Sequence, residues 1–314
     1  MQCLYNLKWF SHCLKTIEAM VTNKSSLTST LNEFFSQIPN HHNKNNIDLI
    51  TLKILSYMRL HTDRNYYPNV QQDPSEFFLH MLSCIHANVI NPRSLAFDIQ
   101  DDESLENSKS SYFQYNLQPL TKFLTTFSKT KRVYNEHAHE KKNQICNTTI
   151  KYQYSGCPIL SLELISQETN QNVQQMLEFK ISKITTFNDL TCSNCESRNV
   201  TGTQQEKIIE FPQYLIIVLQ RFTDGGKNTS PITVGNLDDK TNKISLALEN
   251  MDFSYTLDGC ILHYGPNAMS GHYVSCLNQN NKWFKVDDDK VSKCNPTTVR
   301  TNSDNYMLFY KRNK

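Results

Sequence analysis

Hydrophobic residues near the start of the chain recur at alternating intervals of four and three. This spacing places them on one face of a helix. The positions are Cys3, Leu7, Phe10, Leu14 and Ile17. No Ser, Thr, Asp or Asn precedes this stripe to cap the helix, so we expect the natural start of the helix to lie further upstream.

The same periodicity recurs over residues 27–38 and 47–60, and it predicts two more helices. The polar stretch 40–46 between them predicts a solvated loop. A fourth helix has a well-specified start: Asp73 stands at the N-cap, Pro74 at the first helical position and Glu76 three residues after the cap. Its expected buried stripe is Phe77, Met81, Leu82 and Ile85.

From about residue 120 the pattern changes to β-branched and aromatic runs separated by turn residues, and all eight glycines lie in this half. We expect strands over 213–222, 255–265, 272–278, 282–288 and 305–312. The polar tetrapeptide at 278–281 predicts a hairpin turn. A helical first third followed by mostly sheet predicts an α+β fold.

Charge and apolar run length narrow the class of protein. Lys and Arg number 32 against 30 Asp and Glu, so no strong positive field favours nucleic acid as a partner. The longest apolar run, Leu215 to Leu219, is far shorter than the roughly 20 residues of a membrane span. No glycine-rich phosphate loop is found, which argues against kinases, NTPases and dehydrogenases. With no secretory signal, the ten irregularly spaced cysteines indicate reduced thiols and an intracellular protein.

His272 begins one predicted strand and Asp287 ends the next, so the two can face each other across a hairpin. A nucleophile needs a base, and the base needs a third group that fixes its orientation. His272 and Asp287 fit these two roles. An ordinary polar hairpin is the alternative for this pair considered alone.

Five segments considered together favour the catalytic interpretation of this pair over the ordinary hairpin. In their order and approximate spacing, "QQDPSEFFLHML", "CSNC", "FPQYLIIVLQRF", "LHYGPNAMSGHYVSCLNQNNKWFKVDDDKV" and "NYMLFYKR" resemble the ubiquitin-specific proteases. The resemblance extends from Met1 to Arg312. It implies a papain-like cysteine protease fold with a helical thumb, a β-rich palm and β-fingers. On this basis residues 1–314 form one catalytic domain, with 1–105 as the thumb, about 120–210 and 223–250 as the fingers, and 211–222 and 251–314 as the palm.

The resemblance also implies roles. His272 matches the general base and Asp287 the orienting acid, whereas Asp288 and Asp289 are expected to be solvated. Tyr273 resembles a wall of the channel that holds the ubiquitin tail. Asp73 matches an aspartate that bonds the tail backbone, although its role as a helix cap is an equally good explanation.

The implied reaction is thiol-dependent hydrolysis of the isopeptide bond after the ubiquitin C-terminal glycine. Ubiquitin and ubiquitinated proteins would be the partners, without nucleic acid or membrane. The expected location is the cytoplasm, the nucleus or both. No cofactor is required for catalysis.

The nucleophile of the family is a cysteine at the start of the first thumb helix, where the helix N-terminus and a nearby histidine favour the thiolate. "MQCLYN" resembles the end of that segment with Gln2 as its glutamine, so the cysteine is expected seven residues earlier, before Met1. Cys3 lies about two helical turns, roughly 12 Å, beyond the expected position of that cysteine. It is part of the apolar stripe, which favours a role in core packing. Cys84, Cys260 and Cys276 match core positions.

We therefore expect this chain to lack the attacking thiol and to be inactive alone. An inactive pseudo-deubiquitinase that binds ubiquitin is the alternative. A nucleic-acid-binding zinc ribbon built on "CSNC" fits poorly, because the chain is neutral and has no basic stripe.

The fingers of the family often hold zinc between two CxxC pairs. Cys192 and Cys195 supply one pair and Cys146 begins the other, but Thr149 stands where its second thiol is expected. Three thiolates leave a tetrahedral structural site one ligand short. Cys157, His137 or His139 could complete it, and fingers that fold without metal are the alternative.

Overall fold

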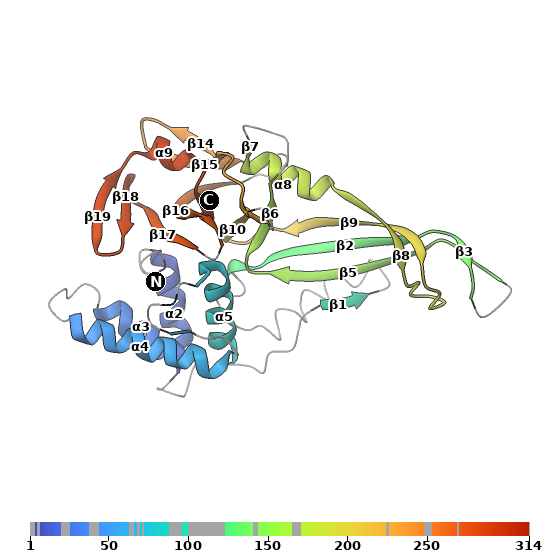
Figure 1. The fold of residues 1–314 in the computed structure, drawn as a ribbon, viewed down its shortest axis with the longest axis horizontal. Helices are drawn as coiled ribbons and strands as arrows, with labels where there is room; N and C mark the ends of the chain where they lie inside the picture. Colours follow the sequence, from blue (N-terminus) through green and yellow to red (C-terminus); the bar gives the residue numbers. More distant parts are fainter. Residues whose placement is uncertain are drawn as a thin grey trace.

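A helical lobe, a central β-sheet and a second, elongated β-sheet make up the molecule in a computed structural model (Figure 1). The structure describes residues 4, 7–19, 26–37, 44–62, 66–67, 70, 72–87, 96–99, 123–140, 144–164, 171–223, 226–247, 253–268 and 270–313. Extensive sheets combined with helices confirm the α+β prediction.

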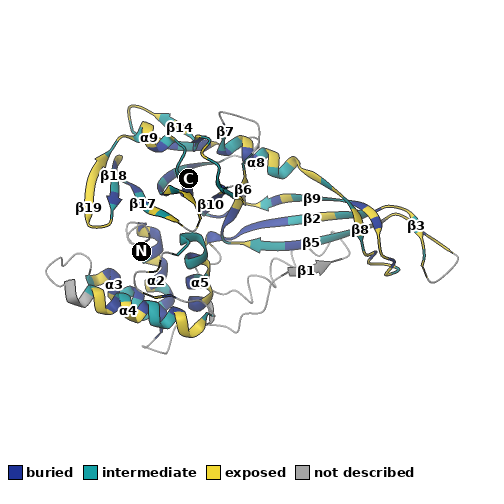
Figure 2. Ribbon diagram, in the orientation of Figure 1, coloured by how far each residue is buried: buried dark blue, intermediate teal, exposed yellow. Residues whose placement is uncertain are grey.

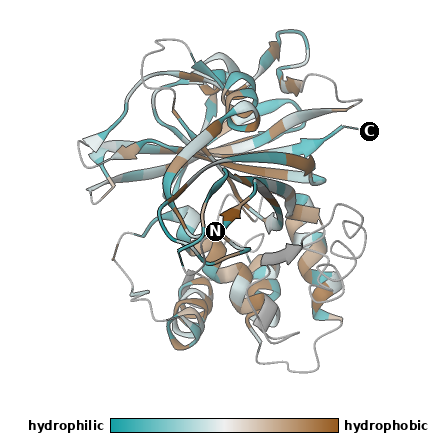
Figure 3. Cartoon of the chain, turned by 90° about the vertical axis from the view of Figure 1, so that its right-hand side faces the viewer, coloured by the Kyte–Doolittle hydropathy of each residue, from teal (hydrophilic) through white to brown (hydrophobic). Residues whose placement is uncertain are grey.

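Four helices build the helical lobe: α2 (Lys8–Glu18), α3 (Leu27–Gln37), α4 (Lys44–His61) and α5 (Pro74–Ala87). They correspond to the four predicted helices. In α2, Phe10, Leu14 and Ile17 are fully buried as the periodicity predicts, whereas Lys8, His12 and Lys15 are exposed. Hydrophobic and hydrophilic positions alternate along the helices of the molecule (Figure 3). Cys3 lies outside the described residues.

The start of α5 confirms the predicted N-cap. Asp73 Oδ1 accepts hydrogen bonds from the backbone N–H of Ser75 at 2.8 Å and of Glu76 at 3.0 Å. These bonds satisfy amide groups that have no partner within the helix, which is why an acidic residue is favoured here. The second oxygen of this carboxylate faces the central sheet.

The central sheet has the strand order β19-β18-β17-β16-β21-β10-β6, and β15 and β14 extend from β16. Its strands are β6 (Leu160–Glu163), β10 (Tyr214–Gln220), β14 (Asn236–Asp238), β15 (Lys243–Ala247), β16 (Ser254–Asn267), β17 (Ser270–Gln279), β18 (Lys282–Asp287), β19 (Lys290–Cys294) and β21 (Asn305–Arg312). All five predicted strands occur in this sheet. Most of its pairs are antiparallel, and β10 pairs with β6 in parallel.

Hydrophobic cores cover both faces of the central sheet. On one face the helical lobe packs against residues such as Ile216 and Val218, and the Trp9 ring stacks on Tyr214 at 4.3 Å. On the other face α8 (Val173–Ser182) packs against Leu215 and its neighbours. A strand that is buried on both sides has a continuous apolar sequence, which explains the run "LIIVL" from Leu215 to Leu219 in β10. Strands β10 and β21 are accordingly buried along most of their length, whereas the edge strand β19 is exposed (Figure 2).

The second sheet, here called the finger sheet, extends away from the rest of the molecule (Figure 1). Its order is β1-β5-β2-β9-β8, with bounds β1 (Ala96–Ile99), β2 (Thr126–Tyr134), β5 (Thr149–Cys157), β8 (Ile184–Leu190) and β9 (Val200–Glu210). A short hairpin of β3 (His137–Ala138) and β4 (Ile145–Cys146) lies at its far end. The strand β1 lies within the range 1–105, which was expected to be helical, and it pairs with β5.

Short elements complete the fold: β7 (Gln171–Asn172), β11 (Phe222–Thr223), β12 (Gly226–Lys227), β13 (Ile232–Thr233), β20 (Thr301–Asn302) and helix α9 (Pro296–Arg300). Among the described residues, no helix combines the length and apolar character needed to cross a bilayer.

Candidate active site

His272 and Asp287 lie in hydrogen-bond contact, with Nε2 of the histidine 2.7 Å from Oδ1 of the aspartate. The structure thus brings together the two residues that the sequence singled out. They are not directly opposite each other, however. Strands β17 and β18 pair from Ser275 with Val286 onward, so the next pair places Asp287 opposite residue 274. The contact is diagonal, which is within reach of a histidine on neighbouring strands.

Two tight turns hold this hairpin. Asn280 and Asn281 join β17 to β18 with φ values of 52° and 62°, the left-handed conformation that a two-residue hairpin requires. Asp288 follows with a φ of 50° in the turn between β18 and β19. Asparagine and aspartate tolerate this conformation better than most residues. The turn predicted at 278–281 is confirmed.

The bond through Nε2 leaves Nδ1 as the ring nitrogen that a thiol would approach. The side chains of His272 and Asp287 are 46% and 35% exposed, so a substrate can reach them. Asp288 is more exposed still, at 79%, with its carboxylate 4.0 Å from the same ring nitrogen. The hydrogen bond from His272, followed by that from Lys285, holds the pKa of Asp287 below its usual value.

Lys285 is a neighbour that sequence reasoning missed. Its Nζ lies 3.1 Å from Oδ2 of Asp287, the oxygen that His272 does not use. The two-residue spacing along β18 was the available signal, because residues i and i+2 of a strand share a face.

Asp73 also contacts the central sheet. Its Oδ2 accepts a hydrogen bond from the Tyr306 hydroxyl at 2.5 Å and a longer one from Tyr273 at 3.4 Å. One carboxylate therefore caps α5 with one oxygen and contacts β17 and β21 with the other. The structure thus brings the side chains of Asp73 and Tyr273 into contact. Tyr306 was not predicted, because 233 residues separate it from Asp73.

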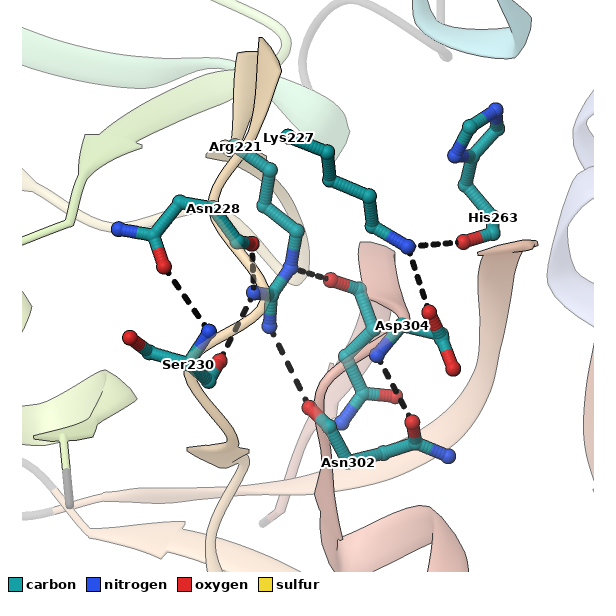
Figure 4. Close-up of polar contacts among 8 residues, drawn as sticks. Arg221, Lys227, Asn228, Ser230, His263, Asn302 and Asp304 are labelled. Atoms are coloured by element: carbon teal, nitrogen blue, oxygen red, sulfur yellow. Dashed lines mark hydrogen bonds and ion pairs between the residues drawn. The ribbon is translucent and has the colours of Figure 1, made fainter. Parts of the chain in front are cut away.

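Buried cations fix the turn that precedes Tyr306 (Figure 4). The fully buried Arg221 guanidinium donates to backbone carbonyls of four residues: Asn228, Ser230, Asn302 and Asn305. Burial lowers the pKa of Arg221 to about 10, which leaves it charged at neutral pH. These bonds join the segment after β10 to the start of β21.

Lys227 adds a second link in the same region. Its side chain is 1% exposed, and its Nζ pairs with Asp304 at 2.5 Å and donates to the backbone carbonyl of His263 (Figure 4). The ammonium group of Lys227 is removed from water, and the carboxylate of Asp304 compensates its charge. Strand β16, which lies beside β17, is thereby fixed to the turn before Tyr306.

Gly271, immediately before His272, is required by close packing. A Cβ at this position would lie 2.2 Å from Nε2 of His263 and 2.6 Å from the carbonyl oxygen of Tyr264. The His263 ring is fully buried and packs against Phe222 and Tyr273, so it has no room to yield. This packing explains the glycine of the "GHY" segment.

No cysteine of the described part of the chain hydrogen-bonds to His272. Cys84, Cys260 and Cys276 are buried in the core, as predicted, and so is Cys13. Burial raises the pKa of Cys13 and of Cys84 to about 11, which suppresses the thiolate.

A second cluster lies in the finger sheet and its end hairpin. Ligand atoms of His137, Cys146, Cys192 and Cys195 all lie within 4.8 Å of one another. The imidazole of His137 contacts Cys195 at 3.1 Å, and the thiols of Cys146 and Cys192 are 3.9 Å apart. Of the three residues considered as a fourth ligand, the fold brings His137 into place.

Three thiols and one imidazole form a set that suits tetrahedral zinc. The hydrogen bond with Ser197 lowers the pKa of Cys195 to about 6, which favours the thiolate that a metal would bind. His137 Nδ1 contacts the Asn135 carbonyl at 2.8 Å and so leaves Nε2 directed at the thiols. Cys157 instead donates to the carbonyl of Ile159.

Cys146 and His137 share this cluster, but they do not resemble a nucleophile and its base. The imidazole contacts Cys195 rather than Cys146, and Cys146 is 6% exposed. Four converging ligand atoms are typical of a closed structural metal site.

The family comparison agrees with this geometry. The family model described as ubiquitin carboxyl-terminal hydrolase matches residues 1–310. The chain therefore belongs to the ubiquitin carboxyl-terminal hydrolase family.

Two curated relatives illustrate the similarity. Ubiquitin carboxyl-terminal hydrolase 17-like protein B of Mus musculus is 30% identical over 162 residues, which is 50% of this chain and 34% of the relative. Ubiquitin carboxyl-terminal hydrolase 25 of Arabidopsis thaliana is 24% identical over 246 residues, 77% of this chain and 33% of the relative. The chain thus spans about a third of the length of these relatives.

Solved structures show the same fold. The SAGA DUB module Ubp8 with Sgf11, Sus1 and Sgf73, bound to monoubiquitin, matches with a TM-score of 0.68 at 19% identity. The match covers 100% of this chain and 65% of that chain. The same module bound to ubiquitin aldehyde matches with a TM-score of 0.65 at 17% identity. These similarities confirm the predicted papain-like fold of ubiquitin-specific proteases.

Proposed function

We propose that this chain carries the base, the orienting acid and the ubiquitin-binding surface of a deubiquitinase. The proposed reaction is hydrolysis of the isopeptide bond after the ubiquitin C-terminal glycine. The observation that carries this proposal is the 2.7 Å contact between His272 and Asp287. The side chains of this pair are accessible, and the next residue, Tyr273, contacts the Asp73 carboxylate that joins the helical lobe to the central sheet. Both observations support a substrate channel in this region.

Each residue has a role in the proposed mechanism. Asp287 accepts a hydrogen bond from Nε2–H of His272 and thereby leaves Nδ1 to take the proton of the attacking thiol. The thiolate then attacks the isopeptide carbonyl, and the imidazolium returns its proton to the leaving lysine amine. Water attacks the resulting thioester with the same imidazole as base, which releases the ubiquitin carboxylate and restores the thiol.

Asp73 and Tyr273 form the proposed contact with the ubiquitin tail. Three donors from the start of α5 occupy Oδ1 of Asp73, so a tail amide would approach Oδ2. The tyrosine bond at 3.4 Å is the longer of the two on that oxygen, and an incoming N–H would displace it first.

The family segment places the attacking thiol at the start of the first thumb helix, and we propose the same place for the thiol of this protein, outside the described residues. The chain by itself would then bind ubiquitin without hydrolysing its conjugates.

A ubiquitin–aminocoumarin substrate tests the function with two proteins, this chain and a version extended upstream by an N-x-x-x-x-C-Y segment. We expect turnover by the extended version alone. Turnover by the present chain would refute the assignment of the missing thiol. A folded but inactive extended version would refute the roles of His272 and Asp287.

A pseudo-deubiquitinase that binds ubiquitin is the second candidate, and Asp73 favours it, because its contacts with Tyr273 and Tyr306 need no nucleophile. Ubiquitin binding without turnover in the extended version would support this candidate over the first.

For the finger cluster we propose structural zinc held by His137, Cys146, Cys192 and Cys195. Bound zinc would cross-link the end hairpin to the turn between β8 and β9, and it would take no part in the chemistry. We also propose the division into thumb, palm and fingers at the boundaries given above, with β1 assigned to the fingers because it pairs with β5.

A further inference from the structure

The Asp287 carboxylate has two partners, one on each oxygen. His272 Nε2 lies 2.7 Å from Oδ1, and Lys285 Nζ lies 3.1 Å from Oδ2. The last torsion of an aspartate side chain joins an sp³ to an sp² carbon and is broad rather than sharply staggered. A carboxylate held at one oxygen alone could therefore rotate, whereas two partners fix its plane.

Lys285 is itself held in place. Its side chain is 34% exposed, and its ammonium lies 5.3 Å from the centre of the Tyr264 ring, within the range of a cation–π contact. Tyr264 is the cross-strand partner of His272 in the pairing of β16 with β17. Lys285 thus contacts both the orienting acid and the residue opposite the base.

We propose that Lys285 is a positioning residue for the candidate base, because it fixes the plane of the Asp287 carboxylate through the oxygen that His272 does not use. The inference rests on the proposed function, in which Asp287 orients His272. Lys285 does not contact the substrate or the thiol in this role. It acts through Asp287, whose carboxylate it keeps directed at Nε2 of His272.

An alternative is that Lys285 only adds positive charge near the hairpin. Lys290 provides a matched control, because it pairs directly with Asp287 across β18 and β19. No ion pair joins Lys290 to Asp287 among the described residues, although Lys285 makes one. Removing either lysine changes the net charge of the hairpin by one, but only Lys285→Met removes the contact.

The test is NMR of the 314-residue chain labelled with ¹³C and ¹⁵N. We expect Lys285→Met to raise the pKa of Asp287 towards that of an ordinary aspartate, because one of the two contacts that lower it is lost. The ¹⁵N shifts of His272 should also show loss of part of the Nε2–H tautomer. Lys285→Arg should restore both signals, and Lys290→Met should change both much less.

An unchanged Asp287 titration and tautomer in Lys285→Met would overturn the proposal, and so would equal effects of Lys290→Met. Both lysines are partly exposed, so folding is checked in the same spectra. Ubiquitin binding and turnover by the extended version test the proposed function separately. If those fail while Lys285→Met alters the titration, the function is wrong and the positioning contact remains.

Discussion

The His272–Asp287 pair and the finger cluster are built differently. The pair lies on one hairpin of the central sheet, and both side chains are more than a third exposed. The finger cluster draws its four residues from the β3–β4 hairpin and from the turn between β8 and β9, and Cys146 and Cys192 are 6% and 1% exposed. Catalytic groups must meet a substrate, whereas a structural metal is enclosed by its ligands. The proposed reactive pair is therefore open to a substrate, whereas two of the four proposed metal ligands, Cys146 and Cys192, are enclosed.

The largest effect is expected at the pair. In the upstream-extended version, Asp287→Ala and His272→Ala should each lower kcat by at least about 1000-fold, because the thiol loses its base or the base loses its orientation. Ubiquitin binding, measured by calorimetry, should stay within a few-fold of the parent. Asp289→Ala on the same turn serves as the control. Retained turnover in either variant would mean that the exposed pair is not catalytic.

The next largest effect is expected at the finger cluster. His137→Ala should weaken zinc binding by more than about 100-fold, since it removes a ligand from a four-ligand site. Zinc content by mass spectrometry and the loss of thermal stability on chelation are the measurements. Cys157→Ser is the matched control, because this thiol lies on β5 but outside the cluster. Equal zinc content in His137→Ala and the parent would refute the ligand assignment.

Gly271→Ala tests the packing behind the exposed pair. The added Cβ would collide with the buried His263 ring, so we expect a loss of about 2–4 kcal/mol in the free energy of unfolding. Urea denaturation measures it, and Ser270→Ala should be nearly neutral because Ser270 is exposed. The double variant Gly271→Ala/His263→Ala should lose less free energy of unfolding than the sum of the losses in the two single variants, because the smaller side chain removes the collision. Additive losses would contradict the collision.

A smaller effect is expected in the pH dependence of stability, where two carboxylates of the central sheet, Asp258 and Asp287, act in opposite directions. Burial raises the pKa of Asp258 to about 6, whereas the contacts with His272 and Lys285 lower the pKa of Asp287. A folded-state pKa above the unfolded value of about 3.9 means that folding favours the protonated form, so stability falls as pH rises from about 4 to 6. Asp287 has the opposite sign, because its contribution is present above the unfolded pKa and is lost as pH falls through the lowered one.

Asp258→Asn should therefore raise the free energy of unfolding by up to about 3 kcal/mol at pH 7.5 and leave it unchanged near pH 4. Thermal unfolding at the two pH values measures the difference. An equal gain at both would show that the carboxylate is not the cause.

Much of the site was predictable because its parts are close in sequence. The stripe of α2, the cap at Asp73 and the strands that carry His272 and Asp287 each depend on local spacing, and the structure contains all of them. The catalytic and ubiquitin-binding roles remain predictions that the experiments above address. The diagonal offset of the pair was not predictable, because register depends on where the hairpin turn begins.

Two contacts that the sequence missed or left open share one feature. Tyr306 contacts Asp73 across 233 residues, and His137 contacts Cys195 across 58. Spacing along the chain carries no information about such contacts. The three candidates for the fourth zinc ligand were equal in sequence, and only the hairpin of β3 and β4 selects His137.

The sequence by itself determined the elements and the chemistry that each could offer, because hydrophobic period, caps and turn residues act over a few positions. The tertiary structure decided which side chains meet: Tyr306 with Asp73, His137 with three thiols, and Lys285 with the far oxygen of Asp287. Hydrogen bonds and metal ligation act over about 3 Å, and only the packed sheets bring residues from distant turns within that range.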